Sequence, residues 1–255
     1  MRNVRSFFCC LAPEVARGSA LVDSGTSPAV YPSDEGPEFI IGAQSKADSG
    51  KKTLVLDLDE TLVHSSFNKV PTPDHVLPVD IDGKMVDVYV QKRPGLDAFL
   101  LDVCAKFEVV IFTASLSKYA APLLDLLDPE GQVRWRLFRE ACSTHRGTYV
   151  KDLCRLGRDL SQTIIVDNSP LSYVFQPGNA VPISTYLGDL NDRGLFSLLP
   201  LLDELTKAED VRECIKGLLG EGNAILTAPG DDVAEIENFV TNVPPPPPPP
   251  SFVQS

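Results

Sequence analysis

The chain has 255 residues, of which 43% are hydrophobic, so it is long enough to bury one sizeable core. Its 35 acidic residues against 23 basic ones give a formal net charge of -12, which disfavours attraction to a phosphate backbone and argues against nucleic acid as a direct ligand. No apolar run reaches the roughly 18 to 20 residues that a membrane-spanning helix needs, so we expect a protein that is soluble or at most anchored.

The first 50 residues are rich in Ser, Gly, Pro and Asp and show no sustained apolar period, so residues 1–50 are predicted to form a disordered leader. In this segment Cys9 and Cys10 follow two aromatic residues and a basic start. That pattern suits S-palmitoylation and a lipid anchor, and it equally suits an unstructured leader. The six cysteines form no CxxC pair and have no zinc-like spacing to His, which fits a reducing compartment.

Three short apolar runs rich in β-branched residues show no alternation, as expected of strands that are buried on both faces. They are Thr53–Leu56, Phe107–Phe112 and Thr163–Val166. Helical spacing of apolar residues between these runs predicts one helix that begins at Pro94 and another that Ser117 caps. Strands that alternate with helices predict an α/β fold, a parallel sheet flanked by helices.

The chain between the first two strands is longer than one crossover helix needs. The extra residues include Val79–Val90, VDIDGKMVDVYV, which predict a β-hairpin inserted near the carboxyl end of the first strand. Helical spacing predicts closing helices over Leu195–Leu205 and Val211–Leu219. Residues 51–220 are therefore predicted to be the catalytic domain.

Residues 221–255 carry scattered acidic residues and then the proline run Pro244–Pro250, and they are predicted to be a disordered tail with a polyproline II segment. Such a run suits an aromatic-lined groove on a polyproline-binding partner. It also suits a tail that binds nothing, and both interpretations stay open.

Each buried run ends in polar residues, at the edge where open parallel sheets bind ligands. Asp57 follows the first run, Thr113 the second and Asp167 the third. A carboxylate at Asp57 is placed to attack a phosphoryl group and form an aspartyl-phosphate. Asp59, two residues on, is the candidate general acid and base, which protonates the leaving oxygen and later activates water.

Two carboxylates and a phosphate repel one another, so the pattern predicts a hard divalent cation, Mg²⁺, held by Asp57, the backbone carbonyl of Asp59, and Asn168. The hydroxyl of Thr113 and the ammonium of Lys151 are candidates for binding the remaining phosphoryl oxygens. Taken singly, a Thr after a strand is often a helix cap and a lone Lys is usually solvated, so these two assignments depend on the whole set.

Five segments, in the same order along the chain, resemble the small C-terminal-domain phosphatases of the haloacid dehalogenase superfamily. They are DLDETLVHSS (57–66), KRPGLDAFL (92–100), FTASLSKYA (112–120), HRGTYVKDLCRLGRDL (145–160) and IVDNSP (165–170). The resemblance runs from about Thr53 to Val211. It implies a haloacid dehalogenase-like Rossmannoid sheet, Mg²⁺, and hydrolysis of phosphoserine in the heptad repeats of the largest RNA polymerase II subunit.

The same resemblance makes Asp57 the nucleophile, Asp59 the acid and base, and Asn168 a magnesium ligand with them, and it makes Thr113 and Lys151 phosphate contacts. It adds Asp167 as a supporting carboxylate. Arg139 matches a peptide-contacting arginine, although a surface salt bridge explains it nearly as well. The implied pocket for a proline of the substrate peptide, on the side of the inserted hairpin, consists of Phe67, Val79, Ile81, Val88 and Leu116. A polymerase substrate implies a nuclear protein, with a membrane-associated pool if the leader cysteines carry lipid.

Two other functions remain as alternatives. A small-molecule phosphohydrolase would use the same site, because one fold serves many substrates; the long resemblance through the hairpin argues against it. A noncatalytic interaction protein would bind partners through its leader and proline run. The presence of the whole set of predicted catalytic residues argues against that alternative.

Overall fold

The computed structural model describes residues 39–81 and 83–220. The predicted palmitoylation site at Cys9 and Cys10, the acidic tail and the proline run Pro244–Pro250 lie outside these residues. Within them, no helix combines the length and the apolar character needed to cross a bilayer.

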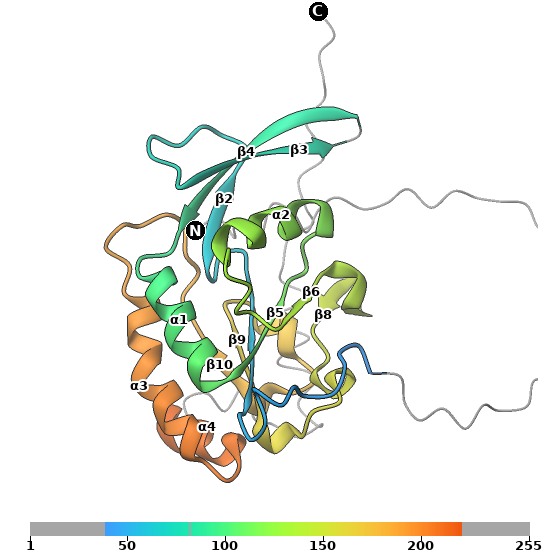
Figure 1. Cartoon of the computed structure of the whole chain (residues 1–255), viewed down its shortest axis with the longest axis vertical. Helices are drawn as coiled ribbons and strands as arrows, with labels where there is room; N and C mark the ends of the chain where they lie inside the picture. Colours follow the sequence, from blue (N-terminus) through green and yellow to red (C-terminus); the bar gives the residue numbers. More distant parts are fainter. Residues whose placement is uncertain (1–38, 82, 221–255) are drawn as a thin grey trace, which may run out of the picture.

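Strands and helices alternate along most of the chain (Figure 1). The strands are β1 (Thr53–Leu56), β2 (Val63–Ser66), β3 (His75–Ile81), β4 (Lys84–Lys92), β5 (Glu108–Phe112), β6 (Trp135–Leu137), β7 (Ser143–His145), β8 (Thr148–Val150), β9 (Thr163–Asp167) and β10 (Ala180–Pro182). The α-helices are α1 (Leu96–Lys106), α2 (Ser117–Leu127), α3 (Gly194–Lys207) and α4 (Val211–Leu219). Short 3₁₀-helices are η2 (Arg139–Ala141), η3 (Leu153–Leu156), η4 (Leu160–Gln162), η5 (Pro170–Tyr173) and η6 (Pro177–Asn179).

The central sheet has the strand order β10-β9-β1-β5-β6, and every neighbouring pair is parallel. β1 lies in the middle, and every residue of β1, β5 and β9 is buried, which explains why their sequences do not alternate. The predicted α/β fold is confirmed. The short strands β6 and β10 escaped prediction, because three residues are too few to show a period.

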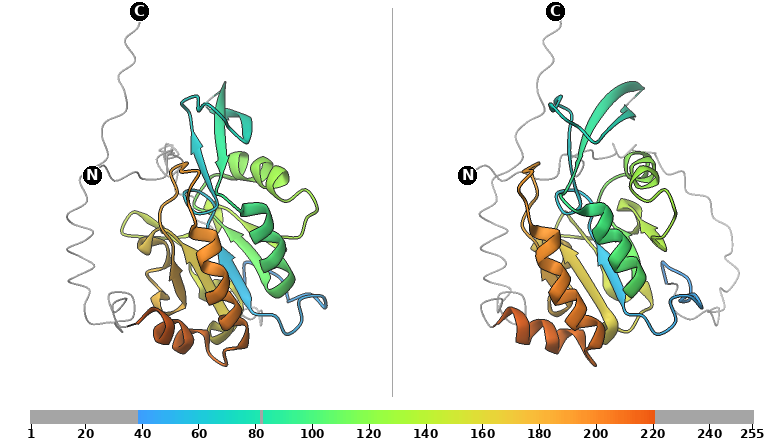
Figure 2. Two further views of the ribbon diagram at one scale, coloured as in Figure 1. Left: turned by 90° about the vertical axis from the view of Figure 1, so that its left-hand side faces the viewer. Right: turned by 60° about the vertical axis from the view of Figure 1, so that its left-hand side comes forward.

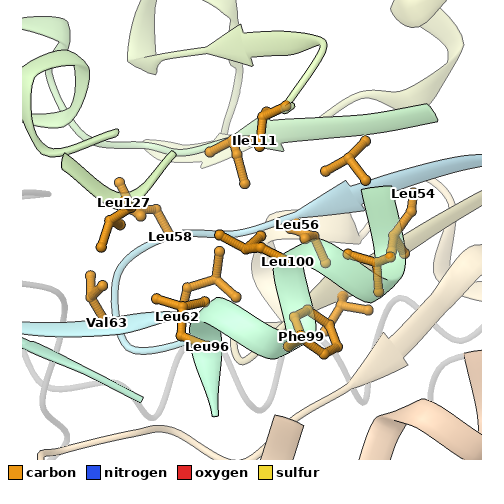
Figure 3. Packing of buried hydrophobic residues seen from close by; sticks show 14 of the residues in the cluster. Leu54, Leu56, Leu58, Leu62, Val63, Leu96, Phe99, Leu100, Ile111 and Leu127 are labelled. Atoms are coloured by element: carbon orange, nitrogen blue, oxygen red, sulfur yellow. The ribbon is translucent and has the colours of Figure 1, made fainter. Parts of the chain in front are cut away.

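Helices α1 and α3 lie side by side on one face of the sheet (Figure 2). Leu96, Phe99 and Leu100 of α1 pack with Leu54 and Leu56 of β1 in the larger core cluster (Figure 3). Each fully buried side chain of this kind stabilises the fold by about 1.5 to 3 kcal/mol. The other face of the sheet packs in a second cluster with the segments η3 and η5.

Residues 39–50, which the sequence assigns to the leader, pack on the domain. Ile41 is 4% exposed and belongs to the second core cluster, and the Ile40 amide donates a hydrogen bond to the carbonyl of Arg155. The ordered domain thus begins before residue 51. The segment is polar apart from a few residues, so its few buried side chains leave no apolar period to detect.

The predicted hairpin is longer than its sequence signal and gains a third strand. β3 and β4 form an antiparallel hairpin around Gly83, and β2 pairs with the other edge of β4. This three-stranded sheet, called the inserted sheet below, projects above α2 (Figure 1). It extends from the segment that follows β1, next to the end of the strand that carries Asp57.

Helix α2 begins without the predicted cap. Ser117 is the first residue of the helix, and the N-cap is Leu116. The backbone of Leu116 is extended, and its carbonyl accepts hydrogen bonds from the amides of Tyr119 and Ala120. The prediction that Ser117 caps this helix is therefore wrong. Ser115, the residue before this N-cap, donates its hydroxyl to Asp59.

Arg93 ties the loop before α3 to the segment after β1. Its side chain is fully buried and donates to both carboxylate oxygens of Asp192, at 2.6 and 2.9 Å, to Ser184 and to the carbonyl of Thr61. The hydrogen bond from Arg93 lowers the pKa of Asp192. A buried guanidinium is tolerated only when its charge is paired and its N–H groups have acceptors. The hydrogen bonds to Asp192, Ser184 and Thr61 meet this requirement.

We expect Arg93→Met to lower the free energy of unfolding by about 3 kcal/mol, since it removes one partner of a largely buried charge pair. Urea denaturation measures the change. Lys207→Met is the matched control, because Lys207 pairs with Glu204 in the open on α3, and an exposed ion pair of this kind contributes little to stability. Equal losses in the two variants would contradict the assignment.

Candidate active site

The carboxyl ends of the three central strands bring the predicted polar residues to one edge of the sheet. Asp57 follows β1, Thr113 follows β5, and Asp167 is the last residue of β9. Parallel pairing in register sets these ends level, since Leu56 lies beside both Ile111 and Val166. Lys151 reaches the same place from outside the sheet, directly after β8 of a separate two-stranded ribbon.

Lys151 lies between two carboxylates. Its Nζ donates to Oδ1 of Asp57 at 2.5 Å and to Oδ2 of Asp167 at 2.6 Å, and the Lys151 side chain is 2% exposed. Burial alone would lower the pKa of Lys151, but the charges of Asp167 and Asp57 outweigh burial and raise it. The ammonium is therefore permanently charged, as a phosphate-binding cation must be.

Asp167 supports this arrangement and does not face solvent. Its second oxygen accepts the backbone N–H of Ser169 at 2.8 Å, and the residue is 1% exposed. Burial raises the pKa of Asp167, and the charge of Lys151 opposes that rise. Asp167 thus holds Lys151 in place together with Asp57.

Asp59 is held by three hydroxyl groups. Its Oδ2 accepts from Ser115 at 2.7 Å and from Thr113 at 3.3 Å, and its Oδ1 accepts from Tyr119 at 2.9 Å. Burial raises the pKa of Asp59 from 3.8 to about 6, the Ser115 hydrogen bond opposes the rise and the charge of Asp57 adds to it. A carboxyl group with such a pKa is suited to give and take a proton near neutral pH.

The raised pKa of Asp59 makes stability depend on pH. Between pH 4 and 6 the folded protein keeps a proton that the unfolded chain has released, so the free energy of unfolding falls as pH rises through this window. A shift of two pKa units corresponds to about 3 kcal/mol. We expect the stability of Asp59→Asn relative to the wild type to increase by about this amount from pH 4 to 7, measured by urea denaturation in metal-free buffer. A difference that stays constant with pH would contradict the assignment.

The oxygen atoms at this edge fit Mg²⁺. Lys151 takes one oxygen of Asp57, and no described residue donates a hydrogen bond to the other. Asn168 is oriented by Thr61, which donates to its Oδ1 at 3.2 Å, and by Thr185, which accepts from its Nδ2. The Asp59 carboxylate already accepts hydrogen bonds from three hydroxyl groups, so the oxygen that Asp59 could offer to a metal is its backbone carbonyl. Among residues 39–81 and 83–220 no group of three His, Cys, Asp or Glu side chains is placed to hold a metal. The candidate ligands are instead one carboxylate, one side-chain amide and one backbone carbonyl, and Mg²⁺ prefers oxygen ligands of this kind.

Of the predicted substrate-pocket residues, two belong to the core. Val79 and Val88 are 3% and 0% exposed and lie in the larger cluster, because the face of the inserted sheet that carries them packs toward α2. Phe67 and Ile81 pack against that cluster and stay partly exposed, as does Leu116 before α2. The alternation that puts Val79 and Ile81 on one face is present in β3.

Arg139 is a buried residue and does not lie on the surface. It is 6% exposed, its Nε donates to the carbonyl of Ala114 at 2.6 Å, and its guanidinium lies 5.0 Å from the ring centre of Tyr149. The contact with Ala114 puts Arg139 beside the turn that carries Thr113 and Ser115.

The sequence interpretation missed the residues that hold Asp59. Ser115 and Tyr119 lie within the segment FTASLSKYA, and Ser65 within DLDETLVHSS, so the resemblance pointed to the region but not to their roles. It also missed Glu60, which is 4% exposed, has a φ of 62° and accepts a hydrogen bond from His64 at 3.0 Å. A left-handed backbone at a non-glycine residue is costly and is concentrated at functional sites.

Comparison with known proteins gives a consistent result. The sequence model of one protein family, the NLI interacting factor-like phosphatases, matches residues 52–212. A human CTD small phosphatase-like protein is 47% identical over 222 residues, which cover 81% of this chain and 80% of that protein. The human carboxy-terminal domain RNA polymerase II polypeptide A small phosphatase 1 is 46% identical over 219 residues, 84% of this chain and 83% of that protein.

A probable C-terminal domain small phosphatase of Dictyostelium discoideum is 62% identical over 163 residues, 64% of this chain, and the match spans only 53% of that protein. The family model covers the central sheet, the inserted sheet and every candidate catalytic residue. The chain belongs to the NLI interacting factor-like phosphatases.

Proposed function

We propose that the protein is a Mg²⁺-dependent protein serine phosphatase that acts through an aspartyl-phosphate on Asp57. The observation that carries this proposal is the pairing of Asp57 with the buried cation Lys151, beside a second carboxyl group, Asp59, whose pKa is about 6. A nucleophile, a fixed positive charge and a proton carrier thus occupy one edge of the sheet. These are the parts that phosphoryl transfer through a covalent intermediate requires.

In the first step an oxygen of Asp57 attacks phosphorus, the bond from phosphorus to the serine oxygen breaks, and Asp59 gives its proton to that oxygen. In the second step Asp59 takes a proton from water, the water oxygen attacks phosphorus, and the bond to Asp57 breaks to release phosphate. Lys151 is suited to bind the equatorial phosphoryl oxygens, and so is the Thr113 hydroxyl once it gives up its 3.3 Å hydrogen bond to Asp59. Bound Mg²⁺, held by Asp57, Asn168 and the Asp59 carbonyl, would neutralise negative charge at this centre.

The proposed substrate is phosphoserine in the heptad repeats of the largest RNA polymerase II subunit, which implies a nuclear location. Two observations support a peptide over a small molecule. One of the human relatives described above has a name that refers to the carboxy-terminal domain of RNA polymerase II. Three apolar side chains are partly exposed, Phe67 after β2, Ile81 at the end of β3 and Leu116 before α2, and they suit a proline of a peptide.

Phosphate release from a phosphoserine-proline heptad peptide tests the proposal, with 4-nitrophenyl phosphate as a second substrate and EDTA in place of Mg²⁺ as the metal control. Peptide turnover that requires Mg²⁺ supports it. Turnover of the aryl phosphate alone would favour a small-molecule phosphohydrolase. No turnover of either substrate by the folded protein would favour a noncatalytic interaction protein.

A further inference from the structure

A chain of hydroxyl groups runs from the inserted sheet to Asp59. Ser65 of β2 lies 2.5 Å from the hydroxyl oxygen of Tyr119 on α2, and that hydroxyl lies 2.9 Å from Oδ1 of Asp59. Ser65 is 4% exposed and Tyr119 is fully buried. Water therefore does not compete for these hydrogen bonds, and their geometry is fixed by packing.

The direction of this chain follows from the number of hydrogens. An ionised Asp59 can only accept, and a phenol has a single hydrogen, so Tyr119 donates to Asp59. Ser65 must then donate to the oxygen of Tyr119. The other oxygen of Asp59 accepts hydrogen bonds from the hydroxyls of Ser115 and Thr113, which lie in the loop between β5 and α2.

The same chain also suits the protonated form of Asp59. A hydroxyl both donates and accepts, so the protonated carboxyl group can donate to Tyr119, and Tyr119 can donate to Ser65. No member of the chain is left without a partner in either form. An acid and base that changes its protonation in each half of the reaction needs such surroundings, whereas a donor such as a Lys ammonium would suit the ionised form alone.

We propose that Tyr119, oriented by Ser65, is a positioning residue that holds the Asp59 carboxyl group for proton transfer to and from the reacting oxygen. This inference rests on the proposed role of Asp59 as acid and base. Since Ser65 is part of β2 and pairs with Val90 of β4, the inserted sheet fixes the far end of the chain. The position of the proton carrier thereby depends on how the inserted sheet packs on α2.

Tyr119→Phe tests the proposal with two aryl phosphates. Phenyl phosphate has a poor leaving group that needs a proton, whereas 4-nitrophenyl phosphate has a good one that does not. The quantity to compare is kcat/KM, which covers the steps up to formation of the aspartyl-phosphate. We expect kcat/KM to fall about 10- to 100-fold for phenyl phosphate, part of the effect of a general acid, and by less than about 3-fold for 4-nitrophenyl phosphate. Equal losses for the two substrates, or no loss, would overturn the proposal.

A second comparison separates positioning from a structural role. In an Asp59→Ala background, Tyr119→Phe should cause no further loss of kcat/KM for phenyl phosphate, because the residue acts only through Asp59. The same loss in both backgrounds would overturn the proposal. Tyr173→Phe is the matched control: Tyr173 is equally buried, but its hydroxyl has no hydrogen-bond partner among the described residues, and we expect both rates to stay at wild-type values.

Ser65→Ala keeps the test open if Tyr119→Phe does not fold, and it should give a smaller loss with the same preference for phenyl phosphate. Asp59→Ala by itself identifies which idea has failed. If Asp59→Ala slows both substrates equally, the acid role of Asp59 is wrong and the inference falls with it. If Asp59→Ala selectively lowers kcat/KM for phenyl phosphate and neither Tyr119→Phe nor Ser65→Ala does so, only the positioning role of Tyr119 is wrong.

Discussion

Asp57→Asn should abolish phosphate release, with a loss of at least about four orders of magnitude in kcat for both peptide and aryl phosphates. The amide that replaces the carboxylate is a poor nucleophile toward phosphorus and does not form the aspartyl-phosphate. It keeps the size of the side chain and leaves the surrounding backbone unchanged. Phosphate release at saturating Mg²⁺ measures the loss, and Glu204→Gln, at an exposed position on α3, is the control that should keep full activity.

The same variant should not be less stable than the wild type. The negative charge of Asp57 raises the pKa of both Asp59 and Asp167, so neutralising Asp57 relieves repulsion between acidic groups. Lys151 keeps its contact with Asp167 at 2.6 Å. Thermal unfolding in metal-free buffer checks this, and a Tm well below the wild type would mean that lost activity reflects unfolding. Residual turnover above about 1% would contradict Asp57 as the nucleophile.

Lys151→Met should be both inactive and strongly destabilised, by about 3 to 5 kcal/mol at pH 8. The methionine fills most of the same space but leaves Asp57 and Asp167, whose side chains are 9% and 1% exposed, without a cation. Buried carboxylates without a partner hold protons more tightly than they do in the unfolded chain. The deficit in the free energy of unfolding should therefore shrink as pH falls toward 5, because protonation removes the uncompensated charges.

Urea denaturation at pH 5 and pH 8 measures this dependence, and a double variant sharpens it. Adding Asp167→Asn to Lys151→Met removes the more buried of the two carboxylates and should recover part of the lost stability at pH 8. The phosphatase activity should stay absent, because Lys151 is still missing. A Lys151→Met protein as stable as the wild type at pH 8 would show that the three groups do not form the buried cluster described above.

The main strands could be predicted from the sequence because the pattern of apolar residues in each strand reports whether one or both of its faces are buried. The runs at Thr53–Leu56 and Thr163–Val166 lack alternation since both faces of the sheet are covered, and the hairpin alternates since one of its faces packs on α2. The boundaries were less accurate. Ser117 lies within the helix it was expected to cap, and residues 39–50 pack on the domain although their sequence shows no period.

The sequence by itself determined that β1, β5 and β9 are buried strands, which polar residues follow them and, through a resemblance, the roles assigned to Asp57 and Asp59. Only the tertiary structure decided what surrounds those carboxylates. The donors to Asp59 are 54 to 60 residues away along the chain, and Arg93 and Asp192 are 99 residues apart. Sequence periodicity reports which face of one element is buried, whereas these contacts depend on how separate elements cross over the sheet and meet at its edge. Hence the proposed catalytic carboxylates could be predicted from the strand that precedes them, and the hydroxyl groups and charges that hold them could not.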